Sequence, residues 1–118
     1  MKKINIYLDD LRDCPSGFVL AKNIEEAKEL IKDNNVGIIS LDHDLGVDKR
    51  GKILPSGYDL VKHMVEFGVK CDSIYLHTDN PVGRDNMYQT LNAAKRRGFI
   101  DDNISVYRYG YTKNTFTK

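Results

Sequence analysis

Residues 36–46 read VGIISLDHDLG, an apolar run that ends abruptly in acidic and imidazole side chains. Four of the six residues in Val36–Leu41 are aliphatic, which is typical of a strand buried inside a parallel sheet. Such a strand would deliver Asp42, His43 and Asp44 to its carboxyl end. Because open α/β sheets bind ligands beyond the carboxyl ends of their strands, this stretch predicts the place of a functional site as well as a strand.

Two other apolar runs end in the same way. Ile4–Leu8 runs into Asp9 and Asp10, and Ser73–Leu76 runs into the sequence HTDN at residues 77–80. If the three strands are parallel, their polar clusters meet at one edge of the sheet. The sequence therefore predicts a metal or phosphate site built from three separate stretches of chain.

Strand and helix patterns alternate along the chain. Strands are expected at residues 4–8, 18–21, 36–41, 73–76 and 104–109. Helices with a capping residue and an apolar stripe are expected at residues 24–33, 57–67 and 81–97. No helix fits the turn-rich stretch between the first two strands. This alternation favours one α/β domain, residues 1–118, with a parallel five-stranded sheet and right-handed crossovers.

Residues 45–67 combine a long basic loop with a helix. The loop, residues 45–55, contains Lys49, Arg50 and Lys52 beside two glycines, and we expect it to act as a mobile lid. The helix carries an apolar stripe that we expect to face the sheet, made of Leu60, Val61, Met64 and Phe67. The polar tail, residues 110–118, predicts no element.

Composition limits the classes of function. Charged residues make up 30% of the chain but nearly cancel, leaving a net charge of +1. This balance argues against stable binding of a nucleic-acid duplex and is compatible with a small anionic ligand. Cys14 and Cys71 lack the spacing of a metal site, and no apolar leader precedes Ile4, so we expect a reducing cytoplasm. No segment is long and apolar enough to cross a membrane.

The acidic clusters predict a cation site. Carboxylates brought together at adjacent strand ends repel one another unless a cation or a shared proton relieves them. Hard oxygen ligands favour Mg²⁺, with Mn²⁺ as the alternative, and the expected ligands are Asp9, Asp10, Asp42 and Asp44. The competing interpretation is that some of these aspartates only cap loops or helices.

The histidines and the third helix start suggest phosphate chemistry. His43 and His77 follow different strands, and together they could act as general acid and general base, or instead as metal ligands or hydrogen-bonding groups. The helix that begins at Pro81 could hold a phosphate with its N–H groups and Arg84, although an ordinary capped helix would look the same. Ser56-Gly57 could add a second anion contact.

The same residues resemble a known group of proteins. The order of acidic pair, aspartate and hydroxyl is similar to the response-regulator receiver domain, in which Asp42 would match the phosphoacceptor. The closer resemblance is to the cyclic-phosphate processing receiver domain. Its patterns Leu-Asp-Asp-x-Arg, Ser-Leu-Asp-His-Asp-Leu-Gly, [Thr/Ser]-Gly-Tyr-Asp and His-[Ser/Thr]-x-Asn-Pro-x-Gly match residues 8–12, 40–46, 56–59 and 77–83.

This resemblance implies a fold and an activity. It implies a flavodoxin-like sheet with strand order 2-1-3-4-5 that lacks the first helix of receivers. It also implies a metal-aided phosphoesterase acting on a 2′,3′-cyclic nucleotide or RNA end, with His43, His77 and Asp42 in catalysis. Together with the reasoning above, it assigns to the phosphate or substrate Arg12, Ser56, Gly57, Thr78, Asn80, Gly83 and Arg84.

Two other functions stay open. A signalling receiver would take a phosphoryl group on Asp42, but receivers carry a lysine at the end of the fifth strand, where this chain has Tyr107-Arg108-Tyr109. A non-catalytic module that binds cyclic nucleotides would need Arg84 and the helix starts, but not both histidines.

Overall fold

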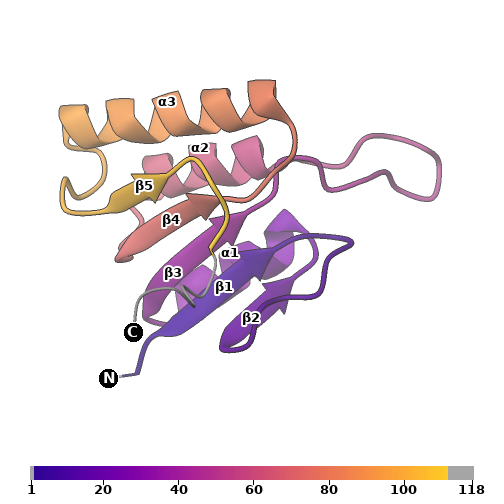
Figure 1. Ribbon diagram of the computed structural model, residues 1–118, viewed down its shortest axis with the longest axis horizontal. Coiled ribbons are helices and arrows are strands. Elements are labelled where there is room, and N and C mark those ends of the chain that lie inside the picture. Colours follow the sequence, from indigo (N-terminus) through magenta and orange to yellow (C-terminus); the bar gives the residue numbers. More distant parts are fainter. Residues whose placement is uncertain (1, 112–118) are drawn as a thin grey trace, which may run out of the picture.

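The computed structural model describes residues 2–111 and contains a five-stranded sheet with three helices (Figure 1). The strands are β1 (Ile4–Leu8), β2 (Phe18–Ala21), β3 (Val36–Leu41), β4 (Ser73–Leu76) and β5 (Ser105–Tyr107). The helices are α1 (Ile24–Asp33), α2 (Gly57–Phe67) and α3 (Pro81–Arg97). All pairings are parallel, in the order β2-β1-β3-β4-β5, which confirms the predicted fold and strand order. Residues 112–118 of the tail lie outside the described residues.

All three helices lie on one face of the sheet. The crossovers from β2 to β3, from β3 to β4 and from β4 to β5 run in the same direction across the sheet. Because such crossovers are right-handed, each one places its helix on the same side. The connection from β1 to β2 runs the other way and contains no helix, as predicted. Within residues 2–111, no helix covers the opposite face.

The core fills the space between the sheet and the helices. Its largest fully buried side chains come from β1, β3 and β4, from the inner stripes of α2 and α3, and from the residue before β5, and they are Ile6, Leu8, Ile39, Leu41, Leu60, Val61, Met64, Ile74, Leu76, Met87, Leu91 and Ile104. Phe67 was expected to face the sheet, but this prediction is wrong, because its side chain is 70% exposed. It lies at the last position of α2, where its ring packs against His63 instead, with 4.6 Å between the ring centroids.

Aromatic side chains cover part of the opposite face. Tyr7, Phe18, Tyr75 and Tyr107 come from four different strands. Tyr111 reaches back over them, with its ring centroid 5.0 Å from that of Phe18 and 5.4 Å from that of Tyr75. Parallel sheets are normally covered by helices on both faces. In this protein the aromatic rings shield part of the face that has no helix.

β5 is shorter than predicted. The sequence indicated residues 104–109, whereas the strand comprises Ser105–Tyr107. Arg108 leaves the sheet because its guanidinium forms an ion pair with Asp85 of α3 and lies over the ring of Tyr88, 5.3 Å from the centroid. No helix in the described part of the chain has the length and apolar character needed to span a membrane.

Candidate metal and phosphate site

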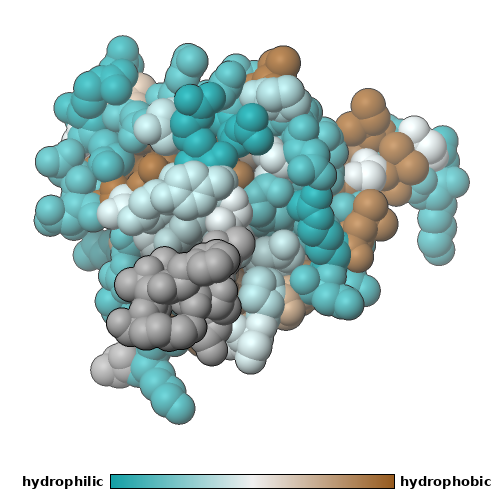
Figure 2. Space-filling model, in the orientation of Figure 1, coloured by the Kyte–Doolittle hydropathy of each residue, from teal (hydrophilic) through white to brown (hydrophobic). Residues whose placement is uncertain are grey.

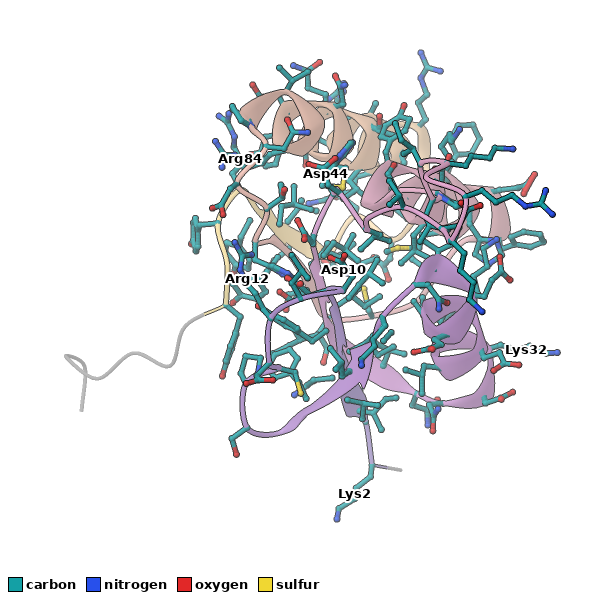
Figure 3. All side chains as sticks on the ribbon, turned by 90° about the vertical axis from the view of Figure 1, so that its right-hand side faces the viewer. Lys2, Asp10, Arg12, Lys32, Asp44 and Arg84 are labelled. Carbon is teal, nitrogen blue, oxygen red and sulfur yellow. The ribbon has the colours of Figure 1, made fainter. Side chains whose placement is uncertain are left out.

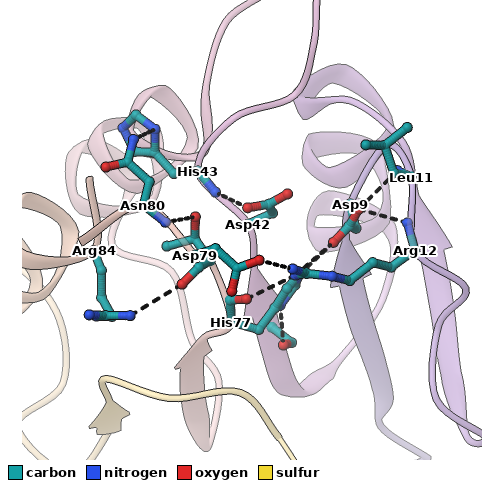
Figure 4. A network of polar contacts seen from close by, with 11 residues as sticks. Asp9, Leu11, Arg12, Asp42, His43, His77, Asp79, Asn80 and Arg84 are labelled. Carbon is teal, nitrogen blue, oxygen red and sulfur yellow. Dashed lines mark hydrogen bonds and ion pairs between the residues drawn. The ribbon is translucent and has the colours of Figure 1, made fainter. Parts of the chain in front are cut away.

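The register of the sheet brings three polar side chains to one point. Leu8 pairs with Leu41, and Leu41 pairs with Leu76, so the residues that follow them leave the sheet at the same level. These residues are Asp9, Asp42 and His77. Their potential ligand atoms all lie within 4.8 Å of one another, and we call this group the strand-end cluster (Figure 4).

Asp9 is the most buried member of the strand-end cluster, with 1% of its surface exposed. One carboxylate oxygen accepts hydrogen bonds from the backbone N–H groups of Leu11 and Arg12, both at 2.9 Å. The other oxygen lies 2.9 Å from Nε2 of His77. Burial alone would raise the pKa of Asp9, but these hydrogen bonds outweigh it and hold the pKa below its usual value. Asp9 is therefore an anion at neutral pH.

The surroundings of Asp42 stabilise its negative charge less well than those of Asp9 do. Burial raises the pKa of Asp42 above its ordinary value, and the neighbouring Asp9 adds to the increase. Hydrogen bonds from Thr78 and from the backbone N–H of His43 oppose this shift without cancelling it. Two close carboxylates in a half-buried site form a donor set that a divalent cation would stabilise.

His77 completes the strand-end cluster with a neutral ring. Burial lowers the pKa of His77, against the opposing effect of Asp9. The ring stacks on Tyr7, with 4.2 Å between centroids and 2° between planes. Its Nδ1 lies 2.7 Å from Oγ of Ser40, and its Nε2 faces Asp9. Because a hydroxyl can donate or accept, Ser40 satisfies either neutral tautomer, including the one whose Nε2 is free to ligate a metal.

We expect Ser40→Ala to lower the free energy of unfolding by about 1–3 kcal/mol, because a buried ring nitrogen of His77 loses its hydrogen-bond partner. Urea unfolding at pH 7 measures the change. Ser105→Ala on β5 is the matched control, because Ser105 is exposed and the same substitution there should have almost no effect. Equal effects of the two substitutions would show that the hydroxyl of Ser40 does not support the ring.

His43 lies outside the strand-end cluster. Its Nδ1 is 2.9 Å from Oδ1 of Asp44. The same nitrogen is 3.4 Å from Nδ2 of Asn80 (Figure 4). The ring packs against the first turn of α3, where a Cβ on Gly83 would lie only 2.4 Å from it. The two histidines of the predicted acid–base pair therefore have separate surroundings. His77 faces Asp9, and His43 faces Asp44.

The four predicted metal ligands divide into two pairs. Asp9 and Asp42 belong to the strand-end cluster, which His77 joins. Asp10 and Asp44 line the same pocket of about 500 Å³ but are not in that cluster. Oδ2 of Asp10 lies beside Gly46, and Asp44 is bound to His43, which lowers the pKa of its carboxyl group.

Three of the predicted phosphate-binding residues line this pocket, namely Arg12, Thr78 and Asn80, and Arg84 contacts one of them from outside the lining. Arg12 donates from Nη1 to the carbonyl of His77 at 3.0 Å and forms a 2.5 Å ion pair with Asp79. Arg84 donates to the carbonyl of Thr78 at 3.3 Å. Figure 3 shows Arg12 and Arg84 on the same side of the site, beside Asp10 and Asp44. Two guanidinium groups next to an acidic cluster could neutralise an anionic ester that the cluster alone would repel.

A family model described as the cyclic-phosphate processing receiver domain matches residues 4–93. The chain belongs to this family. The matched range contains the whole strand-end cluster, the dyad of His43 and Asp44, and both α2 and the greater part of α3. No curated protein and no solved structure matches the chain.

Three residues that were assigned to the substrate have packing roles in this receiver domain. The backbone N–H of Ser56 donates to Asp59 at 2.7 Å and forms part of a capping box for α2. Gly57 lies against Asp42, whose carbonyl oxygen would be 1.9 Å from a Cβ at that position. Gly83 makes room for the ring of His43. None of the three lines the pocket, although Thr78, Asn80 and Arg12 do.

Sequence reasoning gave no role to two residues of this receiver site. Ser40 is completely buried, and Tyr7 lies under the ring of His77. The position of Ser40 inside an apolar strand is a signal that could have been used, because a buried hydroxyl needs a hydrogen-bond partner. The stacking of Tyr7 on His77 depends on the pairing of distant strands and leaves no local pattern.

A larger hollow, of about 750 Å³, lies at the opposite edge of the receiver sheet. It is bordered by α1 and α2, and its lining includes Lys32, His63, Phe67 and Lys70. Among residues 2–111, the ligating side chains gather at the smaller pocket, so we place the functional site there.

Proposed function

We propose that this domain hydrolyses cyclic phosphate esters, such as a 2′,3′-cyclic nucleotide or RNA end, with a divalent cation held by Asp9, Asp42 and His77. The observation that carries the proposal is the strand-end cluster, whose three ligating side chains approach within 4.8 Å on adjacent strands. Membership of a family of cyclic-phosphate processing receivers supports the substrate class.

The donor set fits Mn²⁺ as well as Mg²⁺. The sequence suggested four carboxylates, which favour Mg²⁺, whereas the strand-end cluster combines two carboxylates with an imidazole. When bound, such a cation would polarise the phosphoryl oxygens. Nearby, Arg12 and Arg84 would neutralise the remaining charge of the ester.

The dyad of His43 and Asp44 is the best candidate for proton transfer. Asp44 holds Nδ1 of His43, which leaves Nε2 to exchange a proton. In hydrolysis a water oxygen bonds to phosphorus and one ester P–O bond breaks, and His43 would take the proton that the water loses and return it to the departing ribose oxygen. His77 is less suited to this task, because Ser40 and Asp9 engage both of its ring nitrogens.

A screen of substrates tests this proposal. We would incubate the protein with 2′,3′- and 3′,5′-cyclic nucleotides and cyclic-phosphate-ended RNA, with Mg²⁺ or Mn²⁺, and follow the products by phosphorus NMR. Conversion of a cyclic ester to a monoester supports the proposal. Binding without conversion of any ester would favour the non-catalytic module.

The signalling alternative has a structural argument against it. Arg108, the cation nearest in sequence to the position of the receiver lysine, pairs with Asp85 on α3 rather than with Asp42. Acid-labile phosphate on Asp42 after incubation with a small phosphodonor would nevertheless favour a signalling receiver over a hydrolase.

His43→Ala should lower kcat by about 10²–10⁴-fold while leaving Mn²⁺ affinity unchanged, because His43 takes part in proton transfer and lies outside the strand-end cluster. Turnover assays and Mn²⁺ titration give the two quantities. His63→Ala on α2, at the opposite edge of the sheet, should change neither. A full rate in His43→Ala would remove His43 from the mechanism.

A further inference from the structure

We infer that three exposed apolar side chains around the pocket, Leu11, Val47 and Ile53, bind the nucleobase of the substrate. We call them the apolar rim. This inference rests on the proposed function and narrows its substrate class to cyclic phosphates that carry a base. The apolar rim would determine substrate specificity without taking part in metal binding or proton transfer.

Leu11 lies at the mouth of the pocket with its side chain exposed to solvent. Its side chain is 88% exposed, and the residue belongs to the pocket lining. Its backbone is fixed, because its N–H donates to Oδ1 of Asp9 at 2.9 Å. The same carboxylate therefore contributes to the strand-end cluster and positions an apolar side chain beside it.

Val47 and Ile53 form the second part of the apolar rim. They are paired by an antiparallel bridge and are 57% and 80% exposed. Gly46, just before Val47, lines the pocket and lies beside Asp10, just before Leu11. Leu11 therefore lines the pocket itself, whereas Val47 directly follows a lining residue and Ile53 lies beside Val47 through the bridge.

The loop that carries Val47 and Ile53 is a defined hairpin. Asp48 accepts hydrogen bonds from the N–H groups of Arg50 and Lys52, at 2.8 and 2.9 Å, and its own N–H donates to the carbonyl of Lys52. Figure 1 shows this hairpin projecting beyond the body of the domain, and Figure 2 shows apolar surface along it. The hairpin thus presents its apolar side chains in a set geometry; its closure as a lid stays a prediction.

A base is the occupant that fits these features. Single exposed apolar residues are common, but three around the mouth of a site for an anionic ester call for an apolar group attached to that ester. Flat bases are held between apolar or aromatic side chains. Beyond the apolar rim, the exposed cations Lys49, Arg50 and Lys52 would attract a phosphate on the 5′ side of the base.

Three substrates of increasing size test the inference. They are glycerol 1,2-cyclic phosphate, which has no base, uridine 2′,3′-cyclic phosphate, and a uridine dinucleotide ending in a 2′,3′-cyclic phosphate. We expect kcat/KM to rise in this order. Leu11→Ser and Ile53→Ser should each raise KM for the uridine mononucleotide about tenfold and leave the glycerol ester unaffected. Phe67→Ser, at an exposed apolar site on the opposite edge of the sheet, should change neither KM.

A binding measurement keeps the test independent of turnover. The methyl NMR signals of Leu11, Val47 and Ile53 should shift when uridine 2′,3′-cyclic phosphate is added with Mg²⁺, and not when the glycerol ester is added. Such shifts without hydrolysis would support base binding and count against the proposed function. Equal kinetics for all three substrates, or rim signals that do not respond, would overturn the inference and leave hydrolysis standing. Rim signals that change only with protein concentration would overturn it in favour of a second copy of the chain.

Discussion

Asp42→Asn should lower turnover of a cyclic phosphate by about a thousandfold or more and weaken Mn²⁺ binding, without unfolding the domain. The substituted amide keeps an oxygen that can accept the hydrogen bond from the backbone N–H of His43, which the carboxylate accepts at 2.8 Å. What it removes is one of the two negative charges in the strand-end cluster. Kinetics with Mn²⁺ and direct Mn²⁺ titration measure the two losses.

The free energy of unfolding of Asp42→Asn should not fall with its turnover and Mn²⁺ affinity. Because the pKa of Asp42 is raised, its folded carboxylate binds a proton more tightly than the unfolded one. Its ionisation therefore reduces stability as pH rises from the unfolded pKa through the folded pKa. At pH 7 Asp42→Asn should be at least as stable as the parent in urea, and the difference should vanish at acid pH.

Asp72→Asn provides the control for Asp42→Asn. Asp72 pairs with Lys3 at the opposite edge of the sheet, where both side chains are largely exposed, so the substitution should leave turnover and Mn²⁺ affinity unchanged. Normal Mn²⁺ affinity in Asp42→Asn would contradict the assignment of Asp42 as a ligand.

The convergence of the three strand ends could be predicted from sequence, but the division of labour among their residues could not. Parallel strands bring their carboxyl ends together whatever side chains follow, so an edge site was a topological consequence. Consecutive residues at a strand end point in different directions. Asp9 therefore joins the strand-end cluster while Asp10 lies beside Gly46, and His43 turns away from its neighbour Asp42.

The errors in the fold came from ends of elements, where tertiary contacts decide. Phe67 continues the apolar stripe of α2 in sequence, but the last turn of the helix leaves it 70% exposed. Tyr107-Arg108-Tyr109 has the residue types of a strand, yet the ion pair of Arg108 with Asp85 draws the chain out of the sheet. A local pattern does not encode this partner, since Asp85 lies 23 residues from Arg108 in the sequence.

The role of Gly57 also depends on contacts that the local sequence does not reveal. A glycine at a helix start beside a presumed phosphate site is typical of anion binding, which is how Gly57 was interpreted. Its N–H instead donates to the carbonyl of His43 at 2.8 Å, and its missing side chain lets α2 approach the backbone of Asp42. The residue serves the site indirectly, by fixing the distance between helix and strand end.

Gly57→Ala should therefore destabilise the domain by about 3 kcal/mol, the upper part of the range for overpacking. The added Cβ would lie 1.9 Å from the carbonyl oxygen of Asp42, and neither backbone can yield without moving α2 or the end of β3. Urea unfolding gives the change in free energy. Because a shift of Asp42 opens the strand-end cluster, Mn²⁺ affinity should fall in the same variant.

Gly98→Ala separates this steric effect from the general consequence of replacing a glycine. Gly98 ends α3 with a φ of +78° and has nothing within 4 Å of its Cβ position, so alanine there adds only backbone strain of about 1–2 kcal/mol. It should be less destabilising than Gly57→Ala and should leave Mn²⁺ affinity intact. The opposite ranking, or normal Mn²⁺ binding by Gly57→Ala, would mean that close packing of α2 on Asp42 does not set the geometry of the site.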